Sequence, residues 1–247
     1  MTGSIFAEPR IVHDIADCYF YHSMEIPGHG EVRGEWDLRA RTPEYLGNVN
    51  FAGKRVLEIG PASGYLTFYM ERHGAEVVCV DVDDTRPWNF VPHVGLIDER
   101  FIEDRRQHIA RMKNGFWFAH RAFGSHARVH YGDPTALPKE IGRFDIVVMA
   151  NVLLHCRDAA GILTHCASLA DQTAIVTEWK VIESDLPVAY LVPTAENRFV
   201  DTWWAFSPQF FEQLFRVLGL PRVRSAPHEQ LHGSGEMRAQ YTVVGER

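Results

Sequence analysis

The feature that most constrains this chain is the segment VLEIGPASGYL at 56–66, where an apolar run ends in a glycine-rich turn. The run before Gly60 has the aliphatic composition of a buried strand, and a helical pattern follows over 63–73 until Gly74 stops it. Glycines at 60 and 64 let the backbone pass close to a ligand, because no Cβ stands in the way. The segment therefore predicts a strand–turn–helix unit whose turn faces a ligand.

The remaining chain continues this alternation of strands and helices. Buried-strand runs are predicted at 54–60, 76–82, 127–133, 144–150 and 173–179. Helices are expected from Asp158 and from Ser207-Pro208, and two last strands, near 222–226 and 239–245, are joined by the turn HGSGE. Apolar strands separated by helices predict an α/β fold, with a doubly wound, mostly parallel sheet of seven strands and an antiparallel last strand.

Three segments exceed this minimal scheme. Residues 1–50 are expected to form a helical N-terminal extension that acts as a lid, and 51–247 to form the main domain. Insertions at about 83–126 and 180–206 follow the carboxyl ends of strands, where ligands bind in open α/β sheets. We therefore expect the insertions to build a substrate pocket, the alternative being surface decoration.

Aromatic side chains are dense in both insertions. The candidate substrate-binding residues are Trp117, His120, Trp203 and Trp204, and Trp88 is a further aromatic residue there. An aromatic cavity with a few polar groups suits a ring-bearing or sugar-like small molecule.

Composition excludes several classes of protein. No apolar run approaches the roughly 20 residues that a membrane-spanning helix needs, and the first residues, MTGSIFAEPR, lack a secretory pattern. The four cysteines and 13 histidines show no metal-ligand spacing, so we expect no metal. A net charge of −7 disfavours a nucleic-acid partner without excluding tRNA. These features favour a cytoplasmic protein with no membrane partner, and they leave its oligomeric state open.

The turn also discriminates between cofactors. A dinucleotide motif needs glycines where Ala62 and Tyr65 stand, and a phosphate loop needs Gly-Lys-Ser/Thr, which is absent. A carboxylate such as Glu58 beside the turn would repel a pyrophosphate but suits an ammonium group or another cation. Asp81, at the end of the second strand, is placed to accept hydrogen bonds from a ribose hydroxyl pair.

With these residues the chain resembles the class I S-adenosylmethionine-dependent methyltransferases, in which an acid-x-Gly-x-x-x-Gly motif precedes an acid that ends the second strand. Glu58, Gly60, Gly64 and Asp81 match that pattern. The resemblance implies a Rossmann-like fold and S-adenosylmethionine as cofactor, with the glycine loop on its methionine part, Asp81 on the ribose and Asp133 near the adenine. The full set of implied cofactor residues adds Pro61, Ala62, Ser63, Val82, Pro134, Asn151 and Val152.

A closer likeness involves EWDLR (35–39), NVLLHCRD (151–158) and the stretch 193–208. These segments are similar to the carboxymethyltransferases of the tRNA wobble uridine and their uncharacterised relatives. The likeness implies that Trp36 and Arg39 close the cofactor pocket. Because Leu154 stands where that family has a carboxylate-reading tyrosine, ordinary methyl transfer is favoured over carboxymethyl transfer.

Methyl transfer to a hydroxyl needs a base as well as alignment. His155, just past the fourth strand, is the first candidate, the alternative being a packing role in that loop; Glu178 and His120 are the next candidates. We expect methylation of a small molecule, most simply at a hydroxyl of a natural product or sugar-like acceptor. A tRNA-modifying enzyme and a non-catalytic S-adenosylmethionine-binding module are the alternatives.

Overall fold

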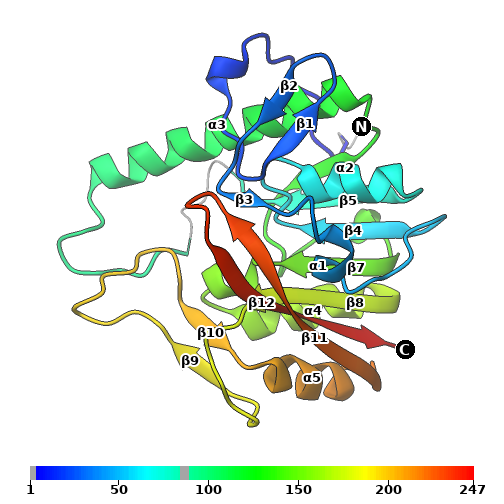
Figure 1. Ribbon diagram of the computed structural model, residues 1–247, viewed down its shortest axis with the longest axis vertical. Helices are drawn as coiled ribbons and strands as arrows, with labels where there is room; N and C mark the ends of the chain where they lie inside the picture. Colours follow the sequence, from blue (N-terminus) through cyan, green and yellow to red (C-terminus); the bar gives the residue numbers. More distant parts are fainter. Residues whose placement is uncertain (1–3, 84–88) are drawn as a thin grey trace.

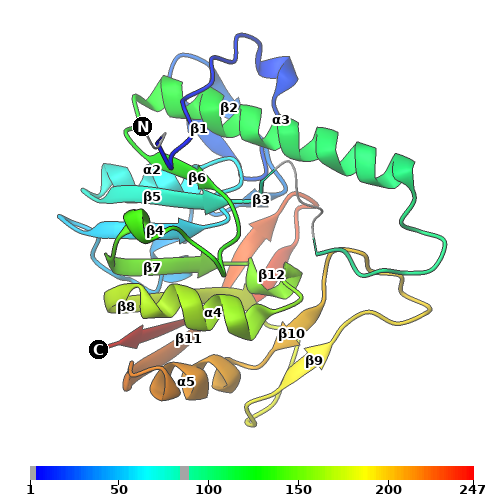
Figure 2. The same ribbon diagram turned by 180° about the vertical axis from the view of Figure 1, so that it is seen from behind.

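The computed structural model describes residues 4–83 and 89–247. Its main sheet has eight strands in the order β3-β11-β12-β8-β7-β4-β5-β6 (Figures 1 and 2). Their bounds are β3 (Trp36–Asp37), β4 (Arg55–Ile59), β5 (Glu76–Asp81), β6 (Arg128–Tyr131), β7 (Phe144–Ala150), β8 (Ala170–Trp179), β11 (Arg222–His232) and β12 (Met237–Glu246).

Strands β6, β5, β4, β7 and β8 are mutually parallel, and β12 is antiparallel to both β8 and β11. The predicted Rossmann-like sheet with an antiparallel last strand is therefore confirmed. It has one strand more than expected. Strand β11 continues to His232, well past 226, and its last two residues pair with β3.

Helices cover both faces of the sheet. On one face α2 (Tyr65–Arg72) and α3 (Glu99–Phe123) pack against alternate strand residues such as Val56 and Val148. On the other face α4 (Ala159–Ser168) and α5 (Pro208–Val217) pack against Leu57 and Val147. Neighbouring strand residues point to opposite faces, so one apolar run supplies both cores. The 3-10 turns η2 (Lys139–Ile141) and η3 (Leu153–His155) flank β7.

The N-terminal segment corrects the expectation of a helical extension. Its helical turns are η1 (Ile15–Asp17) and α1 (Thr42–Tyr45), and between them lies a hairpin of β1 (Met24–Ile26) and β2 (Gly30–Val32). The hairpin turn has left-handed backbone at Gly28 (φ 78°) and Gly30 (φ 80°), which glycine adopts freely. The sequence PGHG at 27–30 therefore forms the hairpin turn.

The two insertions contact one another. The first contains α3, whose N-terminal half projects beyond the sheet, and the second contains the antiparallel pair β9 (Ala189–Leu191) and β10 (Trp204–Phe206) (Figure 1). The backbone of Val91 donates to that of Val200 at 2.8 Å. The imidazole of His93 hydrogen-bonds the carbonyl of Phe199 at 3.0 Å. Trp88 lies outside the described residues. In the described part of the chain, no helix has both the length and the apolarity to cross a membrane.

Candidate active site

The glycine loop after β4 has the shape that a closely approaching ligand requires. Gly60, Ala62 and Gly64 all have left-handed backbone, with φ of 71°, 51° and 88°. A Cβ added to Gly64 would lie 2.6 Å from Phe68 and 2.9 Å from Phe116, so only glycine fits there. The N–H of Gly60 donates to the carbonyl of Val80 at 2.8 Å, which ties the loop to the end of β5.

The N-terminal segment rests on this loop. The hydroxyl of Ser63 accepts hydrogen bonds from the backbone N–H of Tyr21 at 3.1 Å and of His22 at 3.3 Å. The side chain of His22 is 6% exposed, and its Nδ1 has no hydrogen-bond partner among the described residues. Burial lowers the pKa of His22 to about 3, so the ring is neutral at physiological pH. A buried, unpartnered polar atom thus lies beside the predicted cofactor loop.

Glu58 is buried beneath the loop. Its Oε2 accepts a hydrogen bond from the hydroxyl of Thr67 at 2.5 Å. Burial, together with the nearby charges of Asp81 and Glu71, raises the pKa of Glu58 to about 7. A cation placed here would relieve that cost, so this edge of the sheet favours a positively charged ligand.

Asp81 and Asp133 follow neighbouring strands and reach the same edge. The N–H of Gly132 donates to the carbonyl of Asp81 at 2.9 Å, which joins the ends of β5 and β6. Asp81 Oδ1 accepts from the N–H of Val82 at 2.8 Å. Asp133 Oδ1 accepts from the N–H and the hydroxyl of Thr135, so this carboxylate also shapes the turn that contains Pro134. The structure thus brings together the acids that the sequence assigned to the cofactor.

The loop after β7 meets the glycine loop from the other side. Asn151 has φ of 51°, a strained conformation for a residue other than glycine. A Cβ on Gly60 would lie 2.7 Å from Val152 Cγ2, so the two loops are in direct contact. The Asn151 amide Nδ2 donates to Tyr45 Oη at 2.9 Å and to Gln240 Oε1 at 3.2 Å.

His155 stands at the end of η3 with an exposed side chain. Its Nδ1 hydrogen-bonds the carbonyl oxygen of Asp201 in the second insertion. A carbonyl only accepts, so Nδ1 carries the proton and Nε2 is the basic nitrogen. The arrangement is that of an imidazole held in one tautomer with its basic nitrogen available.

Glu178 supports the turn that carries His155. It is 2% exposed at the end of β8, and its Oε1 accepts from the N–H of Leu154 at 3.2 Å. Burial raises the pKa of Glu178 to about 8. Since the carboxyl group is enclosed and bonded to η3, its place fits the positioning of His155 rather than contact with a substrate.

The structure corrects the predicted roles of His120 and Trp117. Both lie in the half of α3 that packs on the sheet, His120 hydrogen-bonded to the carbonyl of Ala127 and Trp117 to Tyr131 Oη, each at 3.0 Å. Ala127 precedes β6, so His120 lies toward the opposite edge of the sheet from the glycine loop. Trp117 is 2% exposed. Both side chains are therefore held in the packing between α3 and the sheet, and we drop both from the site.

Trp36 and Arg39 have different outcomes. Trp36 is buried, its Nε1 donates to Tyr21 Oη at 3.2 Å, and its ring lies 6.3 Å from that of Trp179 at the end of β8. Trp36 therefore lies near the carboxyl end of β8, and its contact with the cofactor stays a prediction. Arg39 is committed to Asp37 at 2.6 Å and Glu31 at 2.8 Å, a surface cluster within the N-terminal segment. That pairing corrects its predicted contact with the cofactor.

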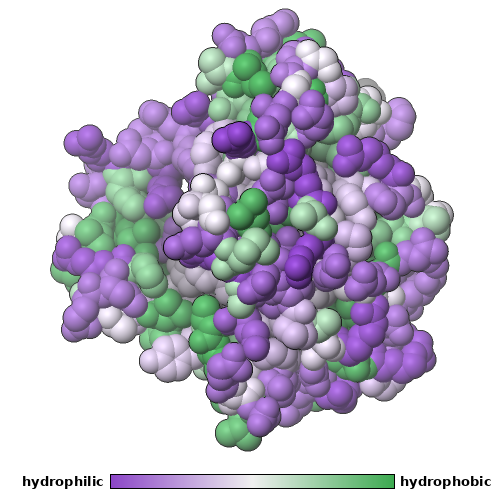
Figure 3. Space-filling model, in the orientation of Figure 1, coloured by the Kyte–Doolittle hydropathy of each residue, from purple (hydrophilic) through white to green (hydrophobic). Residues whose placement is uncertain are grey.

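Trp203 and Trp204 lie where the second insertion meets the loop after β7. The backbone N–H of Trp203 donates to the carbonyl of Leu154 at 2.8 Å, and its indole donates to the carbonyl of Asn89. The indole of Trp204 donates to the carbonyl of Arg157 at 3.3 Å. Both therefore remain candidates for the substrate side. Large apolar and aromatic side chains of this insertion are exposed, and Figure 3 shows hydrophobic surface on the same side of the molecule. The exposed residues are Val181, Leu186, Tyr190, Leu191 and Phe199.

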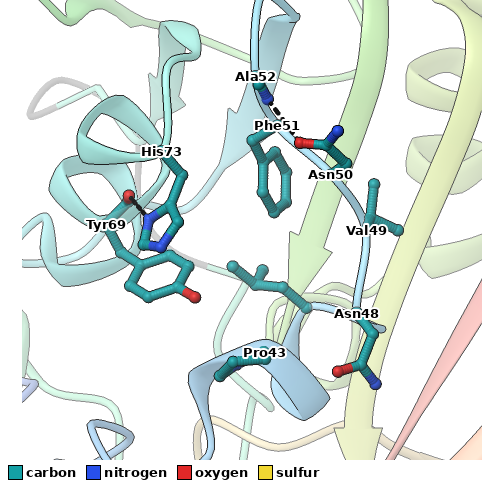
Figure 4. A pocket seen from close by; sticks show the side chains of 9 residues that line it. Pro43, Asn48, Val49, Asn50, Phe51, Ala52, Tyr69 and His73 are labelled. Atoms are coloured by element: carbon teal, nitrogen blue, oxygen red, sulfur yellow. Dashed lines mark hydrogen bonds between the residues drawn. The ribbon is translucent and has the colours of Figure 1, made fainter.

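A cavity of about 440 Å³ lies elsewhere (Figure 4). Its lining includes Pro43, Phe51, Tyr69 and His73, from the segment before β4 and the end of α2. These residues adjoin the amino ends of β4 and β5, so the cavity is on the opposite side of the sheet from the glycine loop. It takes no part in the candidate site.

Sequence reasoning missed the polar residues that line the site from distant segments: His22, Tyr45 and Gln240. Gln240 is fully buried in β12, and its Nε2 has no hydrogen-bond partner among the described residues. For Gln240, the sequence signal that could have been used is a single glutamine within an apolar strand pattern. His22 lies in no periodic pattern, so no such signal was available for it.

Comparisons with known proteins agree with this geometry. A family model described as a methyltransferase domain matches residues 32–221. The chain belongs to this methyltransferase-domain family, and it is a methyltransferase of the S-adenosylmethionine-dependent class. No curated protein sequence matches it.

Two solved structures are similar in fold. One is the N-terminal domain of EvdMO1, in the presence of S-adenosylhomocysteine (SAH) and D-fucose: 21% identity, TM-score 0.50, covering 91% of this chain and 89% of that one. The other is the Burkholderia thailandensis 1,6-didemethyltoxoflavin-N1-methyltransferase, with bound 1,6-didemethyltoxoflavin and SAH: 14% identity, TM-score 0.52, covering 85% and 79%. At these identities the likeness concerns the fold.

Proposed function

We propose that this chain transfers a methyl group from S-adenosylmethionine to a hydroxyl of a small molecule, a natural product or a sugar-like acceptor. The observation that carries the proposal is the meeting, at one edge of the sheet, of the glycine loop, the strand-end acids and an imidazole with a free basic nitrogen. Groups that meet at this edge would thus bind the cofactor, align the acceptor with its methyl group and remove the proton of the acceptor hydroxyl.

The residues present fit this cofactor. Its sulfonium and ammonium are cations, and Glu58, whose pKa is raised by burial, is an acid that a nearby cation would help to ionise. Asp81 stands where a ribose pair is held in nucleotide-binding α/β folds. The unpartnered Nδ1 of His22 beside Ser63 supplies a further polar contact for the ligand on the loop.

The bound cofactor supplies a methyl group already activated by its sulfonium. The chain's own task is to align an acceptor oxygen with that methyl and to remove the hydroxyl proton. We assign the proton to His155 Nε2, with Nδ1–H held by the Asp201 carbonyl and the turn held by Glu178. Fixing one tautomer keeps the basic nitrogen ready without a rearrangement.

Enclosure supports a small acceptor. The N-terminal segment is placed to act as a lid, because it contacts the glycine loop through Ser63 and the β7 loop through Tyr45. The two insertions touch each other and extend that cover beside η3, with Trp203 and Trp204 on the substrate side. The net charge of −7 disfavours a polyanionic substrate.

Incubation with methyl-labelled S-adenosylmethionine tests the proposal. We expect label in a small hydroxylated acceptor from a panel of phenols, polyols and sugars, and none in bulk tRNA. The likeness to the wobble-uridine family remains a prediction, and salt-sensitive retention of tRNA on a filter together with labelled tRNA would favour it. Cofactor binding with no label in any acceptor would favour a non-catalytic module.

A further inference from the structure

Two amide side chains lie side by side in the part of the site where the loop after β7 meets β12. Asn151, after β7, and Gln240, in β12, are joined by the bond from Nδ2 to Oε1 at 3.2 Å. Asn151 Oδ1 and Gln240 Nε2 are both buried, and neither has a hydrogen-bond partner within the described residues. A buried polar atom left without a partner is costly, by about 1–3 kcal/mol, so such a pair signals a ligand.

The pair extends away from the cofactor loop. Asn151 follows β7, the neighbour of β4, and the adjacent Val152 contacts Gly60, whereas Gln240 lies farther along the sheet. Gln240 lies opposite Trp179, the last residue of β8, and β12 stands three strands beyond β4 in the sheet. At a strand spacing of about 4.8 Å, that is roughly 14 Å from β4 along the carboxyl edge. Asp81 lies on β5, on the other side of β4. Gln240 therefore belongs to the acceptor side of the site, and Asn151 lies between it and the cofactor loop.

The chemistry of the pair selects its ligand. The unpartnered Asn151 Oδ1 is an acceptor, and the unpartnered Gln240 Nε2 is a donor. If both amides are turned by 180°, the unpartnered atoms become Asn151 Nδ2 and Gln240 Oε1, which are again one donor and one acceptor. A hydroxyl or a carboxamide, which both donates and accepts, satisfies both atoms. A carboxylate can only accept and an ammonium can only donate, so each would leave one buried atom unpaired.

We infer that the Asn151–Gln240 amide pair is the recognition site for a neutral hydroxyl or amide group of the acceptor. This inference rests on the proposed function and specifies its substrate class. The N-terminal segment covers the pair, since Tyr45 Oη contacts Asn151 and the ring of Trp36 packs near Trp179. Both amide atoms are closed to solvent, so an acceptor reaches them when this segment opens.

A matched set of one-ring probes tests the inference: benzyl alcohol, benzamide, benzoate and benzylamine. Binding to the full chain is measured by ligand-detected NMR with and without saturating SAH. We expect the alcohol and the amide to bind, and the two charged probes to bind more weakly. In Gln240→Leu, binding of the alcohol should fall about tenfold, the range of one hydrogen bond. Equal or stronger binding of a charged probe, alcohol binding unchanged in the variant, or no binding by any probe would overturn the inference.

Stability separates ligand recognition from a structural role. Gln240→Leu removes the Nε2 donor that has no partner, but it also removes the Oε1 acceptor of Asn151 Nδ2, which keeps its bond to Tyr45 Oη. The gain and the loss offset one another, so the melting temperature should stay close to that of the wild type. Gln230→Leu is the matched control, because Gln230 is also buried but its amide contacts the Arg41 carbonyl and His228 Nδ1. The control should melt at a lower temperature and keep its probe binding. A decrease for Gln240→Leu as large as that for Gln230→Leu would also overturn the inference. Titration of SAH into the wild type tests the proposed function by itself, so the two failures are distinguishable.

Discussion

The carboxyl edge of the sheet has two halves that are built in different ways. The cofactor half consists of the ends of β4, β5 and β6, where each functional residue lies at the end of its strand or within two residues of it: Gly60, Asp81 and Asp133. The acceptor half combines η3, the ends of β8 and β12, the second insertion and the N-terminal segment. Local sequence thus determines the first half, whereas packing between distant segments creates the second.

The largest expected effect concerns the acceptor half. Replacing His155 with alanine should lower kcat by roughly 10²–10⁴-fold, because a general base is removed. The affinity for SAH should not change. Steady-state rates with the acceptor found in the labelling panel measure this effect, with His126→Ala, an exposed histidine before β6, as control. Full turnover by His155→Ala would show that the acceptor half works without this base.

A glycine substitution tests the packing of the cofactor half. Gly64→Ala should lower the free energy of unfolding by about 1–3 kcal/mol beyond the strain of its left-handed backbone, because the new Cβ meets Phe68 and Phe116. Gly95→Ala is the control, since Gly95 has φ of 75° but no atom within 4 Å of the added Cβ. Urea unfolding compares them. Equal losses for the two variants would mean that the loop is not packed as described.

A smaller effect is the pH dependence of stability that Glu178 contributes. Its pKa is raised to about 8, so the folded chain binds more protons than the unfolded one, and stability should fall as pH rises toward 8. Below pH 6.5 the lowered pKa values of His22 and His228 act in the opposite sense, which leaves pH 6.5–8 as the clear window.

Glu178→Gln should flatten the decline in melting temperature over that window, because the amide keeps an acceptor for Leu154 and loses the titration. A slope equal to that of the wild type would contradict burial of this carboxyl. Glu58, with a pKa of about 7, accounts for part of the remaining slope.

The same contrast explains what the sequence could predict. The carboxyl ends of the parallel strands, the glycine loop and Asp81 follow from local patterns of apolar runs and turn residues, and the structure has the strand ends within two residues of the expected positions. The density of aromatic residues in the first insertion misled, since the face of α3 that carries Trp117 and His120 packs on the sheet. The pairing of Asn151 with Gln240 spans 89 positions of sequence, and no local pattern encodes such a contact.

Calorimetric titration of SAH tests most directly whether the carboxyl edge of the sheet is divided into a cofactor half and an acceptor half. The account predicts binding at one site per wild-type chain, unchanged affinity in Gln240→Leu, and a loss of roughly tenfold or more in Asp81→Ala, since hydrogen bonds to a charged group contribute about 1.5–3 kcal/mol. Asp171→Ala, at a surface acid paired with Arg143, should bind like the wild type. Undiminished affinity in Asp81→Ala, or a comparable loss in Gln240→Leu, would contradict the account.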